Sequence, residues 1–110
     1  MREVVWVGSS KKDLRSFPRE VIRRFGQALH FAQEGVKHPH AKPFKGLPGS
    51  VFEIVEDFKT DAFRVLYVVQ IEDKIYVLHA CQKKSKTGIK TPKNEIEIIR
   101  KRLKIAKESK

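Results

Sequence analysis

Hydrophobic positions recur with two different periods along the chain, and the change of period separates helical from extended segments. Residues 4–7 are β-branched or aromatic and end at a glycine, which predicts a short first strand. A 3.6-residue period then predicts a short helix with Leu14 and Phe17 on its apolar side, and a second helix with Pro18 in its first turn. Gly35 predicts a left-handed end to this second helix. Its apolar stripe consists of Val21, Phe25, Ala28, Leu29 and Ala32.

Prolines and glycines interrupt the pattern over residues 36–50, which predicts an ordered loop in place of a helix or strand. Loops held by a rigid scaffold often carry function. Three extended segments follow, and their alternation of apolar and polar residues predicts an antiparallel meander. These segments are residues 51–56, 62–71 and 74–82.

Strict alternation along the meander assigns its side chains to two faces. One face holds most of the large apolar residues, and His79 and Cys81 fall on it. We expect the helices to pack against this face. The other face is mixed and carries the charged groups Glu53, Arg64 and Lys84.

A last helix is predicted to begin at Thr91-Pro92, since threonine is a good N-cap and proline suits the first turn. Its apolar stripe is Ile96, Ile99, Leu103 and Ala106, and its other sides are rich in Lys and Arg. The pattern as a whole predicts a single α+β domain over residues 1–110, in the order β-α-α-β-β-β-α.

Charge adds the first indication of function. The 110 residues include 24 Lys and Arg against 13 Asp and Glu, a formal net charge of +11. The excess is uneven, because residues 83–110 hold 11 basic and 3 acidic residues whereas residues 1–82 hold 13 and 10. A field of this sign attracts polyanions, so the charge favours a nucleic-acid ligand. A lysine-rich surface that only confers solubility is the alternative.

The single cysteine, Cys81, excludes an internal disulfide and is typical of a reducing compartment. Its position in an apolar run favours a buried structural thiol over a nucleophile. The N-terminal apolar stretch is too short for an export signal, and no run reaches the roughly 20 apolar residues that span a bilayer. We therefore expect a cytoplasmic protein without a membrane partner.

Metal and cofactor motifs are missing from the sequence. His38, His40 and His79 do not combine with Cys81 in any spacing typical of a zinc site. The sequence also lacks a phosphate-binding glycine loop and the Ser/His/Asp and Cys/His motifs of nucleophilic enzymes. We expect neither a metal nor a cofactor.

Arg64 lies in the middle of the meander, where an unpaired guanidinium would be costly to bury. Glu53 is its natural partner, on the neighbouring strand and the same face. The two could form a structural ion pair, or Arg64 could bind a phosphate while Glu53 orients it or accepts a proton. Lys83, Lys84 and Lys86, where the last strand leaves the sheet, form an anion-binding rim or a solvated charge run.

RNA cleavage requires little more than such groups. The 2′-hydroxyl attacks the adjacent phosphate, so a protein needs to align the reactants, stabilise negative charge and move protons. Arginine and lysine can supply the electrostatic stabilisation, and glutamate or histidine can move the proton without a metal.

Four motifs follow one another along the chain: Lys42-Pro-Phe-Lys45-Gly-Leu-Pro48, Phe63-Arg64-Val65-Leu66-Tyr67, Leu78-His79-Ala80-Cys81-Gln82-Lys83-Lys84-Ser85 and Thr91-Pro92. With the order of elements, they resemble the RelE/ParE toxin superfamily and, within it, the HigB-like phage-derived branch. The resemblance covers essentially the whole chain. It implies a RelE-like fold with a mostly antiparallel curved sheet.

The resemblance also implies an activity, that of a ribosome-dependent endoribonuclease that cleaves translated mRNA. A cognate helix-turn-helix antitoxin would inhibit the enzyme, and only through it would the protein reach operator DNA. By position, Arg64 corresponds to the phosphate-binding arginine of the family, and Lys84 to the basic residue that closes the last strand. We expect the following lysines to hold RNA: Lys42, Lys45, Lys83, Lys86 and Lys90.

Two features depart from RelE. The lysines of its first meander strand, one of them a proposed base, are replaced here by Glu53 and Val55, and residues 85–94 lack its stacking tyrosine. Glu53 is therefore the preferred proton acceptor. His79 is the second candidate, although its alternation favours a packed core histidine.

Two other functions fit the same residues. One is a ParE-like toxin that acts on gyrase without enzymatic activity, and the other is a plain nucleic-acid-binding module. Intact transcripts during growth arrest would indicate the first, and a lack of toxicity would indicate the second.

Overall fold

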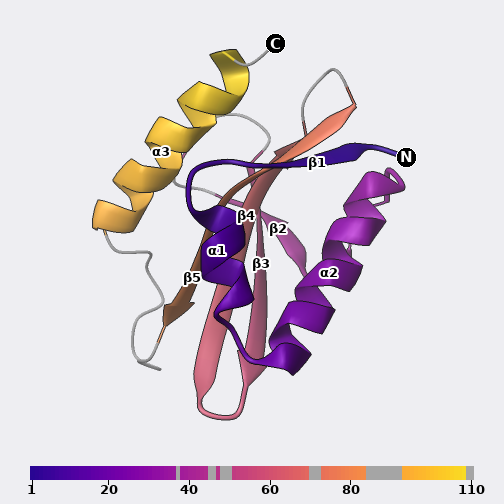
Figure 1. Cartoon of the computed structure of the whole chain (residues 1–110), viewed down its shortest axis with the longest axis vertical. Coiled ribbons are helices and arrows are strands. Elements are labelled where there is room, and N and C mark those ends of the chain that lie inside the picture. Colours follow the sequence, from indigo (N-terminus) through magenta and orange to yellow (C-terminus); the bar gives the residue numbers. More distant parts are fainter. Residues whose placement is uncertain (37, 45–46, 48–50, 70–72, 84–92, 109–110) are drawn as a thin grey trace.

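A twisted sheet lies at the centre of the computed structural model, with helices on both of its faces (Figure 1). The structure describes residues 1–36, 38–44, 47, 51–69, 73–83 and 93–108. Within these ranges the sheet has five strands in the order β1-β5-β4-β3-β2. Along the chain the elements are β1 (Glu3–Trp6), α1 (Ser10–Arg15), α2 (Arg19–Gln33), β2 (Ala41–Pro43), β3 (Val51–Phe58), β4 (Asp61–Val69), β5 (Lys74–Lys83) and α3 (Lys93–Glu108).

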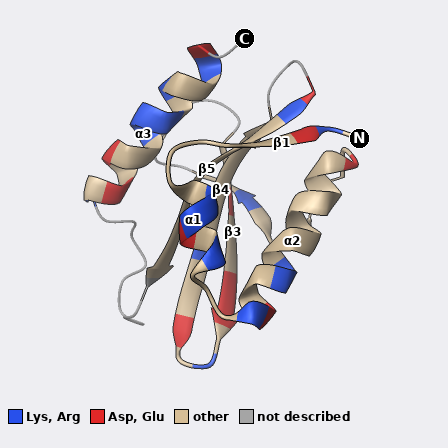
Figure 2. Cartoon of the chain, in the orientation of Figure 1, with Lys and Arg blue, Asp and Glu red and all other residues tan. Residues whose placement is uncertain are grey.

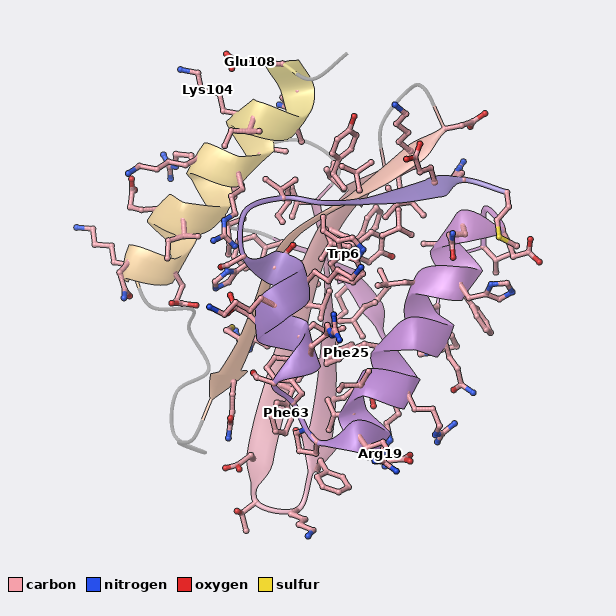
Figure 3. All side chains as sticks on the ribbon, viewed as in Figure 1. Trp6, Arg19, Phe25, Phe63, Lys104 and Glu108 are labelled. Carbon is pink, nitrogen blue, oxygen red and sulfur yellow. The ribbon has the colours of Figure 1, made fainter. Side chains whose placement is uncertain are left out.

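The first core lies between the sheet and the two N-terminal helices. Gly35 follows α2 with φ +79°, as the sequence predicts, whereas Pro18 is the N-cap and lies one residue before the first helical residue. Every residue of the predicted α2 stripe is buried. Phe25 of this stripe and Phe63 of β4 lie between α2 and the sheet (Figure 3). The hydrophobic effect on these side chains fixes α2 across the sheet.

The last helix corrects the expectation that all helices share one face. α3 packs on the opposite face, where its buried residues Ile99, Leu103 and Ala106 form a second core with Leu66 and Leu78. The mixed face of the meander carries enough apolar surface at one end to bind a helix. The charged residues Glu53 and Arg64 thereby lie on the same face as α3.

A β-bulge in β5 corrects the predicted alternation. Leu66 of β4 pairs with His79, whereas the next residue, Tyr67, pairs with Val77, so that Leu78 is the extra residue. The insertion reverses the faces along the rest of β5, which places His79 and Cys81 on the Arg64 face and Ala80 in the first core. The alternation that assigns Lys84 to the Arg64 face is also broken by the bulge, and Lys84 itself lies outside the described residues.

A short strand lies within the segment 36–50, which the sequence predicts as a loop throughout. β2 pairs antiparallel with β3, with Lys42 opposite Glu53. Ala41 is buried in the first core, and Pro43 is tolerated because β2 is an edge strand. Burial of Ala41 and backbone pairing with β3 together outweigh the proline and glycine signals around this strand.

Candidate functional site

Arg64 and Glu53 form an ion pair on the α3 face of the sheet. Arg64 Nη1 donates to Glu53 Oε2 at 3.1 Å. The side chains are only 10% and 17% exposed, so the pair is largely removed from water. In such surroundings each charge acts more strongly than it would at the surface. The structure thus brings together two of the predicted site residues.

The ion pair is part of a row of polar groups that crosses the sheet. Lys42 lies opposite Glu53 on the edge strand and is exposed. Cys81 lies opposite Arg64 on the other side, across the β4–β5 ladder. Since residues directly opposite one another share a face, the row runs from the β2 edge towards α3.

Cys81 is a thiol held in its protonated form. Burial is the largest cause, and together with the charge and hydrogen bond of the neighbouring Glu95 carboxylate it raises the pKa of Cys81 to about 12, against an opposing effect of Arg64. A thiolate is the reactive form of cysteine, so this thiol is a poor nucleophile. The low reactivity fits the sequence-based interpretation of Cys81 as a structural thiol, although the residue is only partly buried and lies on the polar face of the sheet.

His79 is buried, with 5% of its surface exposed, and its Nε2 contacts the carboxylate of Glu95 in the first turn of α3. The sequence analysis did not identify Glu95. A signal for it exists, because Glu95 precedes the buried Ile99 by four residues and therefore lies on the same side of the helix. A stripe defined by apolar residues alone leaves out Glu95, the polar group of α3 that faces the sheet.

The other ring nitrogen of His79 faces Arg102 of α3. Arg102 Nη1 lies 3.4 Å from His79 Nδ1 and 3.0 Å from the carbonyl oxygen of Leu78 at the bulge. Arg102 Nη2 donates to Ser9 Oγ at 3.0 Å, and Ser9 Oγ donates to Asp13 at 2.8 Å. A continuous chain of polar contacts therefore links α1, α3 and the middle of β5, where Leu78 and His79 lie.

Comparison with known proteins places the chain in a family. Residues 12–104 match the family model described as Phage derived protein Gp49-like (DUF891). The chain belongs to this Gp49-like family. The resemblance to the phage-derived branch of the RelE/ParE superfamily is thus confirmed. No curated protein matches the sequence.

Two solved structures share the fold of this Gp49-like protein. One is an E. coli RelE toxin carrying two substitutions, in the free state, with a TM-score of 0.59, 16% identity and coverage of 94% of this chain and 96% of that one. The other is the toxin–antitoxin complex RelBE2 from Mycobacterium tuberculosis, where the matched chain has a TM-score of 0.51, 16% identity and coverage of 74% and 98%. The predicted RelE-like α+β fold is confirmed. No helix in the described ranges of the Gp49-like chain is long and apolar enough to cross a membrane.

Basic residues of the Gp49-like chain gather along α3, whose acidic residues lie at its two ends (Figure 2). Lys104 projects away from the sheet (Figure 3). The backbone of Lys83 ends β5 opposite Ala62. The other lysines predicted to hold RNA, apart from the exposed Lys42, lie outside the described residues: Lys45, Lys86 and Lys90.

His79, Cys81 and Glu95 also form a potential metal-binding group, since one donor atom from each lies within 4.8 Å of the others. The surroundings of His79 disfavour this interpretation. A metal-bound histidine usually donates its second N–H to a carboxylate or carbonyl group, whereas here the second nitrogen faces the guanidinium of Arg102. The group is better suited to hydrogen bonding than to metal coordination, and the predicted lack of a metal stays a prediction.

Proposed function

We propose that this protein is the toxin of a type II toxin–antitoxin pair and a ribosome-dependent endoribonuclease that cleaves mRNA in the cytoplasm. The observation that carries the proposal is the Arg64–Glu53 pair, held nearly buried on a sheet face beside a basic helix. Membership of the Gp49-like family and a RelE-like fold support the same function. The RelBE2 structure, a toxin–antitoxin complex, supports the pairing with an antitoxin.

Arg64 would bind the scissile phosphate. A guanidinium forms two parallel hydrogen bonds to phosphate oxygens and stabilises the charge that develops as the 2′-hydroxyl attacks. Glu53 Oε2 already accepts a hydrogen bond from the Arg64 side chain. Of the two roles predicted for Glu53, orienting Arg64 and accepting a proton, this contact supports the first. The side chains of Arg64 and Glu53 are only 10% and 17% exposed. We therefore expect the phosphate to contact Arg64 only through this small exposed part.

Lysines would hold the rest of the RNA. Lys42 is exposed at the end of the polar row, where a ribonucleotide strand could cross the β2 edge. Lys84 would assist Arg64, and Lys45, Lys83, Lys86 and Lys90 would bind the backbone of mRNA or rRNA, as predicted from the sequence. Such phosphate contacts contribute affinity without base specificity.

The inhibitory partner would be a helix-turn-helix antitoxin, through which the pair binds its operator DNA. The exposed residues Arg100, Lys101, Lys104 and Lys107 give α3 a basic outer surface that favours an acidic antitoxin segment. A helix-turn-helix protein encoded beside this one should copurify with it and relieve its toxicity.

The test is expression of the protein without an antitoxin, with transcript ends mapped after induction. The wild type should arrest growth and produce mRNA fragments with 2′,3′-cyclic phosphate and 5′-hydroxyl ends. Arg64→Ala should reduce cleavage by about 100-fold or more, as is typical when a group that stabilises the transition state is removed. Arg19→Ala, at an exposed position at the start of α2 on the other face of the sheet, is the matched control and should stay toxic.

Each other outcome contradicts the proposal in a defined way. Full toxicity of a folded Arg64→Ala variant would place the site elsewhere. Loss of DNA supercoiling with intact mRNA would indicate a gyrase-directed toxin of the ParE kind. Wild-type protein without any toxicity would indicate a plain nucleic-acid-binding module.

A further inference from the structure

We propose that Glu95 is the proton acceptor of the cleavage site and that His79 is the residue that positions it. The inference rests on the proposed RNA cleavage and assigns a role that the sequence analysis gave to Glu53. It is carried by three observations: the contacts that hold the Glu95 carboxylate, its remaining exposure, and its location one side chain away from Arg64.

The contacts of His79 define which nitrogen carries the proton. An arginine side chain only donates hydrogen bonds, so Arg102 requires His79 Nδ1 to be the acceptor. The proton of the neutral ring then resides on Nε2, which donates to Glu95 Oε1. Cys81 lies on the other side, and its S–H also donates to Glu95. Both neighbours donate to the carboxylate, so these two contacts hold Glu95 in place as an acceptor.

Exposure separates the roles of the two residues in this contact. The side chain of His79 is 6% exposed and that of Glu95 is 23% exposed. A substrate hydroxyl can therefore reach the carboxylate but not the imidazole. His79 is held in turn by Arg102, which is anchored on the Leu78 carbonyl and on Ser9. These contacts hold the Glu95 carboxylate in place while 23% of its side chain stays exposed.

The location of Glu95 fits the position of Arg64. Cys81 is directly opposite Arg64 on the same sheet face, and a carboxylate oxygen of Glu95 lies within 4.8 Å of the Cys81 sulfur. Glu53 lies on the far side of Arg64, where one of its oxygens is already bound by the guanidinium. The contacts of Glu95 are instead with His79 and Cys81.

The reaction then proceeds with one proton accepted and one supplied. Glu95 removes the proton of the 2′-hydroxyl while the 2′-oxygen forms its bond to phosphorus. The bond between phosphorus and the 5′-oxygen breaks, and the leaving oxygen takes a proton from water. Glu95 returns its proton to the resulting hydroxide. The products are a 2′,3′-cyclic phosphate and a 5′-hydroxyl, with no change in oxidation state.

The decisive experiment compares single-turnover cleavage of mRNA on programmed ribosomes by four purified variants. Glu95→Gln should reduce the cleavage rate by about 100-fold or more, as expected for a general base, with ribosome binding unchanged. Glu97→Gln, an exposed glutamate two residues along α3, is the matched control and should cleave at the wild-type rate. Glu53→Gln should retain proton transfer, so its cleavage rate should fall less than that of Glu95→Gln. The cleavage rate of His79→Ala should lie between the rates of Glu95→Gln and Glu53→Gln.

A second measurement separates catalysis from a structural role. The rate of the wild type should fall at low pH as the general base becomes protonated, and Glu95→Gln should lack this limb of the profile. The titratable and charged groups around Glu95 are His79 and Cys81, which contact it, with Arg102 next to His79 and the Arg64–Glu53 pair next to Cys81. In Glu95→Ala, added formate should restore part of the activity, which a purely structural residue would not permit.

The outcomes distinguish failure of this inference from failure of the proposed function. An active Glu95→Gln variant with an inactive Arg64→Ala variant would disprove the role of Glu95 alone. If Arg64→Ala also cleaves normally, the proposed site is wrong as a whole. If Glu95→Gln unfolds, two other variants decide: formate rescue is measured on Glu95→Ala, and the pH profile is measured on Glu95→Asp. The inference is contradicted if formate does not rescue Glu95→Ala and the pH profile of Glu95→Asp is the same as that of the wild type.

Discussion

Gly8 and Arg102 are packed so closely that a side chain at position 8 would occupy the space of the guanidinium. A Cβ placed on Gly8 would lie 2.6 Å from Arg102 Nε, and the glycine has φ +60°, which is unfavourable for other residues. The turn between β1 and α1 is therefore the surface against which Arg102 is held. Arg102 Nη1 in turn lies 3.4 Å from His79 Nδ1, so the turn is linked to His79 through one side chain.

Gly8→Ala should lower the free energy of unfolding by about 2 kcal/mol, from left-handed backbone strain and displacement of Arg102. Gly26→Ala is the matched control, since Gly26 lies exposed within α2 with nothing within 4 Å of an added Cβ. Alanine is the better helix former, so that substitution should stabilise the protein by about 0.5–1 kcal/mol. Urea unfolding of the two variants measures both changes. Equal stabilities would contradict the described packing of Arg102.

The Arg64–Glu53 pair should show strong energetic coupling. Glu53→Met leaves Arg64 nearly buried without this carboxylate and should cost about 2–3 kcal/mol of folding free energy. The double substitution Glu53→Met with Arg64→Met removes both charges and should cost less than Glu53→Met alone. A double-mutant cycle by urea unfolding measures the coupling. Additive losses in the cycle would show that the two side chains do not stabilise one another.

Periodicity in the sequence predicts the elements well because each repeat reflects burial on one side. The stripe of α2, its start next to Pro18 and its end at Gly35 all follow from local residue types. β2 is missed because three residues are too few for a period, and its pairing with β3 is a contact between distant residues.

The site is predicted only in part, for a different reason. Arg64 and Glu53 lie on regular, neighbouring strands, so alternation brings them together correctly. The bulge at Leu78 inserts one residue into β5, and nothing in the local sequence marks it. A one-residue insertion exchanges the two faces of a strand, which is why His79 was assigned to the wrong face. Glu95 could be connected to His79 only once both that face and the position of α3 were known.

The thiol of Cys81 provides a direct test of the Glu95 contact in the folded protein. Because its pKa is raised to about 12, it should react with iodoacetamide far more slowly at pH 8 than the thiol of the protein unfolded in urea. Glu95→Gln removes a charge that disfavours the thiolate, so the pKa should fall and alkylation should accelerate. Glu97→Gln should leave the rate unchanged.

The same raised pKa predicts how stability depends on pH. Below the pKa of the unfolded thiol, about 8.5, both states are protonated and the contribution of Cys81 is fully present. As the pH rises towards the folded value of about 12, only the unfolded state loses its proton, so folding becomes progressively less favourable. Cys81→Ser should therefore flatten the decline in unfolding free energy between pH 9 and about 12. An unchanged decline in this variant would mean that other groups cause it and that the thiol titrates normally.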